Sequence, residues 1–288
     1  MGALPGLLHQ NPENALMITF GAGISAGTTV LFTKHLDCVD LASQAPQIAP
    51  FFEFYNNKIR ENTTLSLHND DARHFLQRST QQYSIITSDA SHPRVYDSWV
   101  LFTSEFYQLV RKRLAEDGIF LQWLPFHGLS PDQYLGIVRT FADAFEHTSI
   151  WSVGEGYSLL VATPRTLTID FQDFLKKIMT PAIRADLHLV GLDNPFEILS
   201  YFIVGEQKVR AMVAENQTLM TDNSPAHVFF PVSSTFKDQY TTWPLMNFQK
   251  VRENKESVIP YLFNLSDDET KKEQLLNVLQ NYEHRKRQ

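Results

Sequence analysis

The sequence predicts a doubly wound α/β fold, in which helices cover both faces of a mostly parallel sheet. Three observations predict it: short apolar runs alternate with helix-length amphipathic segments, a glycine cluster follows the first apolar run, and later runs end at aspartates. Alternating strands and helices are typical of such sheets. Because crossovers between parallel strands are right-handed, the strand ends should share one edge, where ligands bind in these folds.

Apolar runs of strand length, several of them rich in β-branched residues, define the expected strands. The first, residues 15–20, stops at a glycine, as a buried parallel strand does. The other expected strands span residues 36–41, 64–68, 83–88, 119–124, 150–153 and 157–162. A Gly-Glu-Gly turn separates the last two, which should therefore pair antiparallel at an edge of the sheet.

Helices are expected between these strands. In residues 103–114, apolar side chains recur at the spacing of an amphipathic helix, at Phe106, Leu109, Val110 and Leu114. The other helices expected here span residues 28–34, 45–57, 72–78 and 131–145.

After about residue 165 the alternation weakens, and a helical C-terminal extension is expected. Helices should span residues 171–178 and 194–202, and a turn at residues 221–225 precedes a short closing strand segment. The charged tail is typical of a solvated helix with a frayed end. The expected units are a Rossmann-like core, C-terminal helices with the closing segment, and the tail, over residues 1–165, 166–265 and 266–288.

Composition excludes several classes. The 288 residues are 43% hydrophobic and carry a formal net charge of −7, which argues against disorder and against a nucleic-acid partner. Cys38 is the single cysteine and the histidines lack metal-ligand spacing, so neither a disulfide nor a metal is expected. No signal peptide opens the chain, and its most apolar stretch, residues 17–32, is too short to span a bilayer. A cytoplasmic location is expected.

The glycine cluster predicts a nucleoside pocket rather than a merely structural turn. Gly21-Ala22-Gly23 lies between an expected strand and an expected helix, where residues without Cβ atoms allow close backbone approach to a ligand. Asp40, nineteen residues after Gly21, ends the next strand and can accept hydrogen bonds from ribose hydroxyls. The core, residues 1–165, is therefore expected to bind a nucleoside.

Charge at the predicted edge favours one class of cofactor. Asp40, Asp71 and Asp89 would repel a pyrophosphate, whereas they would tolerate a sulfonium cation and an adenine amino group. S-adenosylmethionine or its decarboxylated form is therefore favoured over a dinucleotide.

Longer motifs carry a specific resemblance. Residues 70–76, 83–93 and 101–118 resemble the spermidine synthase (polyamine aminopropyltransferase) family, most closely the bacterial branch in which that domain is fused to a membrane segment. Residues 121–125 and 221–225 also match that branch. The resemblance implies a seven-stranded Rossmann-like sheet of the class I S-adenosylmethionine-dependent methyltransferase type.

The resemblance also implies roles for individual residues. Gly21 and Gly23 would line the amino-acid portion of the cofactor, Asp40 would hold the ribose, and Asp71 with Ala72 would contact adenine. The full expected cofactor-binding set is Gly21, Ala22, Gly23, Asp40, Asp71, Ala72 and Asp89.

Two candidate catalytic positions follow from the same resemblance, Asp89 and His92. Asp89 matches the family's catalytic aspartate, which accepts a proton from the attacking amine or orients it. An alkylammonium, with a pKa near ~10.4, must lose a proton before it can attack. His92 stands where the family has a second aspartate, and Ile24 stands where it has an aspartate in the glycine loop.

The favoured function is transfer of an aminopropyl group from decarboxylated S-adenosylmethionine to a small-molecule amine. Two alternatives stay open: a methyltransferase that uses S-adenosylmethionine, and a non-catalytic nucleoside-binding module. The chain begins about fifteen residues before its first expected strand, so the family's small N-terminal β domain is expected to be missing. A membrane-protein partner, a lost membrane fusion and a homodimer also stay open.

Overall fold

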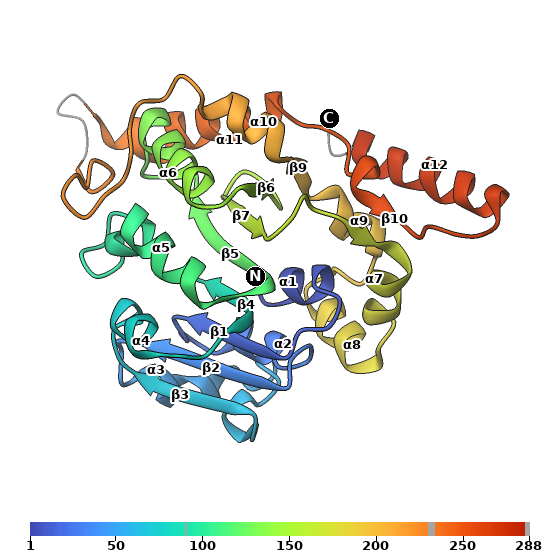
Figure 1. Ribbon diagram of the computed structural model, residues 1–288, viewed down its shortest axis with the longest axis horizontal. Coiled ribbons are helices and arrows are strands. Elements are labelled where there is room, and N and C mark those ends of the chain that lie inside the picture. The colour runs from blue at the N-terminus through green and yellow to red at the C-terminus, as the bar shows by residue number, and fades with distance from the viewer. Residues whose placement is uncertain (90, 230–233, 286–288) are drawn as a thin grey trace.

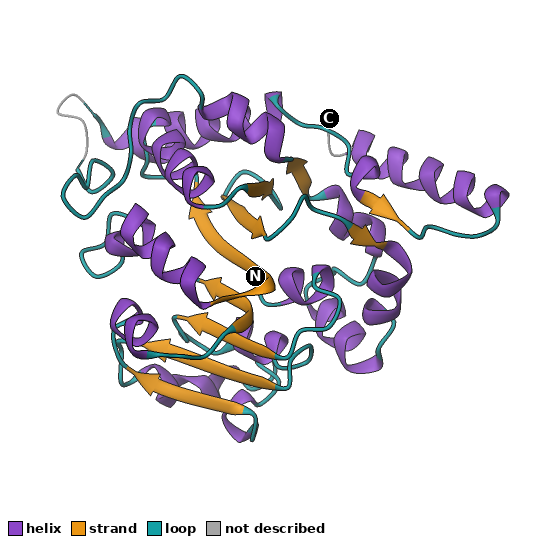
Figure 2. Cartoon of the chain, in the orientation of Figure 1, coloured by secondary structure: helices purple, strands orange, loops and turns teal. Residues whose placement is uncertain are grey.

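The computed structural model describes residues 1–89, 91–229 and 234–285. Within these residues an eight-stranded sheet has the order β3-β2-β1-β4-β5-β7-β6-β9, and β8 and β10 form a separate pair (Figures 1 and 2). The strands are β1 (Asn14–Ile18), β2 (His35–Asp40), β3 (Leu65–Asn69), β4 (Tyr83–Ser88), β5 (Leu114–Pro125), β6 (His147–Trp151), β7 (Tyr157–Thr163), β8 (Ile169–Asp170), β9 (Phe202–Val204) and β10 (Leu262–Phe263).

Pairing in the sheet is parallel from β3 to β5 and antiparallel beyond it. The predicted doubly wound fold is therefore confirmed, and β1 to β7 are its seven expected strands. An eighth strand, β9, pairs antiparallel with β6 and takes the edge position that the sequence assigned to the strand pair at residues 150–162. It begins at the last residue of a segment predicted to be helical throughout, residues 194–202, of which only Pro195–Ser200 is helix.

Helices cover both faces of the sheet (Figure 1). They are α1 (Ala3–Leu8), α2 (Ile24–Thr29), α3 (Ala45–Ile48), α4 (Ala72–Arg78), α5 (Ser104–Arg113), α6 (Pro131–Ala144), α7 (Phe171–Ile178), α8 (Pro181–Leu189), α9 (Pro195–Ser200), α10 (Glu206–Val213), α11 (Trp243–Glu253) and α12 (Glu269–Arg285). In the described residues no helix has the length and apolar content needed to cross a membrane.

The core is built on both sides of β5. Because successive strand side chains point to opposite faces, Phe120 and Leu124 pack with α5, α6, α10 and α11. Ile119 and Leu121, from the other face, pack with α1, α7, α8 and α9. Fully buried aromatic side chains dominate the first layer, where the Phe120 and Phe141 rings stack at 5.5 Å.

Two predicted segments differ from the structure for local reasons. The helix expected over residues 45–57 ends at Ile48 and continues as a 3-10 turn, Ala49–Phe52, because Pro50 cannot donate a helical hydrogen bond. The helix expected over residues 28–34 instead begins at Ile24, directly after the glycine loop. The closing segment expected after residue 225 is turn as far as residue 228 and bend at 229, and residues 230–233 lie outside the described ones.

Candidate functional site

The carboxyl ends of the first four strands lie at one edge of the sheet. Ile18, the last residue of β1, is the parallel partner of both Val39 and Ser88, and β2 and β3 end side by side. The residues predicted to form the site follow these ends: Gly21 to Gly23 after β1, Asp40 at the end of β2, Asp71 and Ala72 after β3, and Asp89 and His92 after β4.

A cavity of about 320 Å³ opens at this edge. Its lining combines four aspartates with apolar and small polar residues, namely Ile18, Thr19, Val39, Asp40, Leu41, Ala42, Asp70, Asp71, Ala72, Ser91, Asp97, Ser98 and Leu101. No basic side chain is among these described residues, so the cavity attracts cations and repels anions. A larger cavity, about 560 Å³, lies beside His9 and Asp117 at the opposite end of β5, and none of the predicted site residues lines it.

The glycine loop has the backbone that its sequence predicts. Gly21 and Gly23 have φ values of 53° and 76°, in the left-handed region that glycine adopts without strain. A Cβ atom at Gly23 would lie 2.8 Å from Ile59, whereas one at Gly21 would meet nothing within 4 Å. Gly21 is therefore open to a ligand, and Gly23 is packed against the fold. Ala22 lies between them, and its carbonyl accepts a hydrogen bond from Asn56.

Asp40 holds this loop through its carboxylate. Oδ2 accepts from the Phe20 amide at 2.7 Å and from the Gly21 amide at 3.3 Å, and Oδ1 accepts from the Ala42 amide at 2.8 Å. A carboxylate has about four acceptor positions, so about one is left for a ribose hydroxyl. The carboxylate that was expected to bind a ribose thus also shapes the loop beside it.

Asp71 uses one carboxylate oxygen within the fold, which leaves the other oxygen available to a ligand in the cavity. It is the N-cap of α4, and Oδ1 accepts from the His74 amide at 2.9 Å. Asp70, its neighbour, is engaged by His74 and Arg78. Ala72 is buried and lines the same cavity. Asp71 and Ala72 therefore lie together in the lining of the cavity.

Asp89 is anchored next to the glycine loop. Its amide donates to the Ile18 carbonyl at 3.1 Å, and its carbonyl accepts from the Thr19 hydroxyl at 2.6 Å. Its carboxylate Oδ2 accepts from the Ser25 hydroxyl in the first turn of α2 at 3.1 Å. Asp89 does not line the 320 Å³ cavity. Its hydrogen-bond partner Thr19 does line it. The residue after it, Ala90, lies outside the described residues.

His92 is part of the packing of two loops. Its Nε2 donates to the His127 carbonyl at 2.8 Å, and its Nδ1 accepts from the Arg94 amide at 3.1 Å. A Cβ atom at Gly128 would lie 2.6 Å from Nε2, so the half-buried ring packs closely against Gly128. Burial lowers the pKa of His92 to about 4, which keeps the ring neutral at pH 7. Both ring nitrogens are therefore used within the fold.

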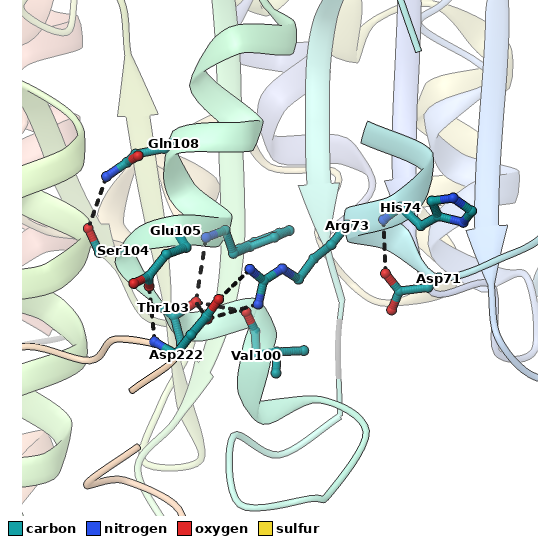
Figure 3. Close-up of polar contacts among 10 residues, drawn as sticks. Asp71, Arg73, His74, Val100, Thr103, Ser104, Glu105, Gln108 and Asp222 are labelled. Atoms are coloured by element: carbon teal, nitrogen blue, oxygen red, sulfur yellow. Dashed lines mark hydrogen bonds and ion pairs between the residues drawn. The ribbon is translucent and has the colours of Figure 1, made fainter. Parts of the chain in front are cut away.

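Motifs far apart in the sequence meet in one polar network beside the cavity. Arg73 forms two hydrogen bonds with the Asp222 carboxylate, at 2.8 and 2.5 Å, and the Thr103 hydroxyl donates to the same carboxylate at 2.9 Å. The Asp222 amide donates to Glu105 at 3.0 Å. Figure 3 shows the Arg73 side chain extending from α4 toward Asp222 and the start of α5. The network fixes the helix that begins at Asp71.

The sequence did not reveal three contributors to the site. Asp97 lines the cavity from the loop after β4, a loop that a Ser91–Ser98 hydrogen bond of 2.9 Å holds together. Asn56 and Asn57 contact the glycine loop and α2. The asparagine pair carried a local signal, because asparagine tolerates the left-handed conformation that ends helices. Asp97 carried none.

Comparison with known proteins supports the resemblance. Residues 1–125 match the model of the spermine/spermidine synthase domain. A polyamine aminopropyltransferase of Oceanobacillus iheyensis is 23% identical over 192 residues, 65% of this chain and 34% of the relative. One of Streptococcus uberis is 31% identical over 121 residues, 41% of this chain and 42% of the relative. The chain thus spans a third to two fifths of the length of these two curated relatives.

Solved structures agree on the fold. A spermidine synthase in complex with the transition-state analogue AdoDATO has a TM-score of 0.52 at 19% identity, over 61% of this chain and 62% of that one. A probable spermidine synthase of Corynebacterium glutamicum has a TM-score of 0.51 at 14% identity, over 77% and 75%. The predicted resemblance to this family is confirmed, with the family match lying in residues 1–125.

Proposed function

We propose that this chain, whose residues 1–125 match the spermine/spermidine synthase domain, binds decarboxylated S-adenosylmethionine and transfers its aminopropyl group to a small amine. The acidic cavity at the strand ends carries the proposal. Its four aspartates and lack of basic side chains suit a ligand that bears a sulfonium and an ammonium, and they disfavour a dinucleotide.

The residues present fit such a ligand. The unpaired oxygen of Asp71 would accept a hydrogen bond from the adenine amino group, and buried Ala72 would pack against the ring. Asp40 would give its remaining acceptor position to a ribose hydroxyl. Gly21, which has open space where a side chain would lie, would let the amino end of the ligand approach the backbone. Asp97 adds negative charge to the lining of the same cavity.

Asp89 is the proposed proton acceptor. When bound, decarboxylated S-adenosylmethionine supplies a carbon activated by the adjacent sulfonium. As the amine nitrogen bonds to this carbon, the carbon–sulfur bond would break and methylthioadenosine would leave. The amine must also give up one proton, which the Asp89 carboxylate would receive. Ser25 donates to Oδ2 and so orients the carboxylate beside the glycine loop. Holding the amine in line with the carbon–sulfur bond would supply much of the remaining rate enhancement.

Calorimetry and product analysis test the proposal. We expect the purified chain to bind decarboxylated S-adenosylmethionine, and methylthioadenosine to form when putrescine is added. Asp89→Asn should lower the rate by about 10²- to 10⁴-fold with little change in ligand binding. Asp117→Asn, at the opposite end of β5, is the matched control and should leave the rate unchanged.

Two results would contradict the proposal. Absence of heat with both decarboxylated and ordinary S-adenosylmethionine would show that the cavity does not bind this class of ligand. Formation of S-adenosylhomocysteine in place of methylthioadenosine would identify methyl transfer instead.

A further inference from the structure

Two asparagines after the 3-10 turn hold the carbonyls of the glycine loop and α2. Asn56, only 1% exposed, donates through Nδ2 to the Ala22 carbonyl at 3.0 Å and to the Ala49 carbonyl at 2.8 Å. Asn57 donates through Nδ2 to the Gly27 carbonyl at 3.1 Å. The turn is therefore attached to both the glycine loop and the helix that follows it.

The backbone of this turn packs directly against the backbone of α2. A Cβ atom at Gly27 would lie 2.1 Å from the Asn56 carbonyl oxygen, so the two backbones touch directly. Asn57 and Lys58 both have a φ of 52°, a left-handed conformation that costs free energy in residues other than glycine. Such a conformation persists only where surrounding contacts hold it.

One of these contacts comes from the C-terminal part of the chain. Asp186, on α8 and 8% exposed, accepts from Asn57 Nδ2 at 2.6 Å through Oδ1 and from the Thr28 hydroxyl at 2.8 Å through Oδ2. One buried carboxylate thus bridges α2 and the asparagine turn, which lie 158 and 129 positions away in the sequence. Asp186 lies outside the family match, which ends at residue 125, whereas both of its partners lie within it.

We propose that Asp186 is a positioning residue for the glycine loop, through which α8 sets the affinity of the site for its donor ligand. Loss of its carboxylate would leave the Thr28 hydroxyl and the Asn57 amide without their shared partner and would release α2. Because Ser25 on α2 also orients the Asp89 carboxylate, release of α2 would disturb both the loop and the proton acceptor. The effect on ligand affinity rests on the proposed function, whereas the effect on loop stability does not.

Hydrogen exchange of the ligand-free protein tests the structural half of the proposal. In Asp186→Ala we expect the α2 amides that close the first turns, those of Gly27 and Val30, to exchange at least about fivefold faster than in the native chain. Asp186→Asn can accept from Asn57 and donate to Thr28, so it should restore near-native exchange. Asp193→Ala removes another carboxylate of this region, which pairs only with His188 in the described residues, and serves as the control.

Ligand binding tests the functional half. The dissociation constant for decarboxylated S-adenosylmethionine should rise about five- to tenfold in Asp186→Ala and less than threefold in Asp186→Asn. If Asp186→Ala is too unstable to purify, Thr28→Val removes one arm of the bridge and should show a smaller change in the same direction.

The outcomes separate the two proposals. Equal α2 exchange in Asp186→Ala and Asp193→Ala would overturn the positioning role, as would faster exchange that Asp186→Asn fails to restore. If the native chain binds no adenosyl ligand, the proposed function fails, and the positioning role is judged on exchange alone.

Discussion

Substitution of Asp222 by alanine should destabilise the protein by about 2–4 kcal/mol, because it removes the centre of the polar network beside the cavity. The carboxylate accepts two hydrogen bonds from Arg73 and one from Thr103. Hydrogen bonds to charged groups contribute about 1.5–3 kcal/mol each when buried. The Asp222 side chain is 33% exposed and that of Arg73 is 19% exposed, so solvent screening reduces the sum.

Urea unfolding at pH 7 measures this loss, and a double-mutant cycle with Arg73→Met isolates the ion pair. We expect a coupling free energy of about 1–2 kcal/mol. Asp143→Ala, which removes an exposed pairing with Arg139 on α6, should cost no more than about 0.5 kcal/mol. A loss below 0.5 kcal/mol for Asp222→Ala, or a coupling near zero, would refute the assignment of the network as a stabilising element.

The same variant has a predicted pH dependence. Hydrogen bonding to Arg73 is the main cause that lowers the pKa of Asp222 below its ordinary value. A carboxyl whose pKa is lower in the folded state stabilises the fold fully above its unfolded pKa, about 4, and less as the pH falls through its folded pKa. The difference between the native chain and Asp222→Ala should therefore shrink only below about pH 4. A difference that already shrinks between pH 7 and 5 would contradict this account.

Three further predictions follow from the site and its supports. Burial lowers the pKa values of His92 and His227 to about 4; since an unfolded histidine titrates near 6.5, urea unfolding should show stability falling as the pH drops from about 6.5 toward 4, and less steeply in His92→Gln. Gly27→Ala should lower stability by more than about 2 kcal/mol in thermal unfolding, because its Cβ would lie 2.1 Å from the Asn56 carbonyl oxygen; an unchanged melting temperature would contradict that contact. Asp71→Asn should keep the helix N-cap but weaken binding of decarboxylated S-adenosylmethionine about tenfold in calorimetry, and equal affinity would remove Asp71 from the binding site.

Local patterns in the sequence were sufficient to predict most of the sheet and the edge at which the candidate site lies. The helix predicted over residues 72–78 is α4, and the strand predicted over residues 83–88 is β4. Apolar periodicity indicates which side chains of a segment are buried, and the polar residues that follow a strand indicate where it ends. Both signals come from residues only a few positions apart in the sequence. Parallel strands must then end at the same edge, so Gly21, Asp40, Asp71 and Asp89 had to meet there.

Local patterns gave wrong predictions where the backbone conformation of single residues, or a contact with a residue distant in the sequence, determined the structure. Pro50 and the left-handed Asn57 break the segment predicted as a helix over residues 45–57. His92, placed by sequence at a catalytic position, packs against the His127 carbonyl, 35 positions away. The motif alone suggested that His92 is available for chemistry. In the folded chain, the packing of two loops uses both of its ring nitrogens.

The sequence by itself determined the sheet, its open edge and the acidic character of that edge, because these follow from which residues are apolar, which are charged and how they are spaced. Only the tertiary structure decided what holds the edge in shape: the Arg73–Asp222 pair spans 149 positions and the Asp186–Thr28 contact spans 158. Such contacts form when packed helices bring distant side chains together, and no periodicity along the chain records which of many carboxylates will lie opposite which donor.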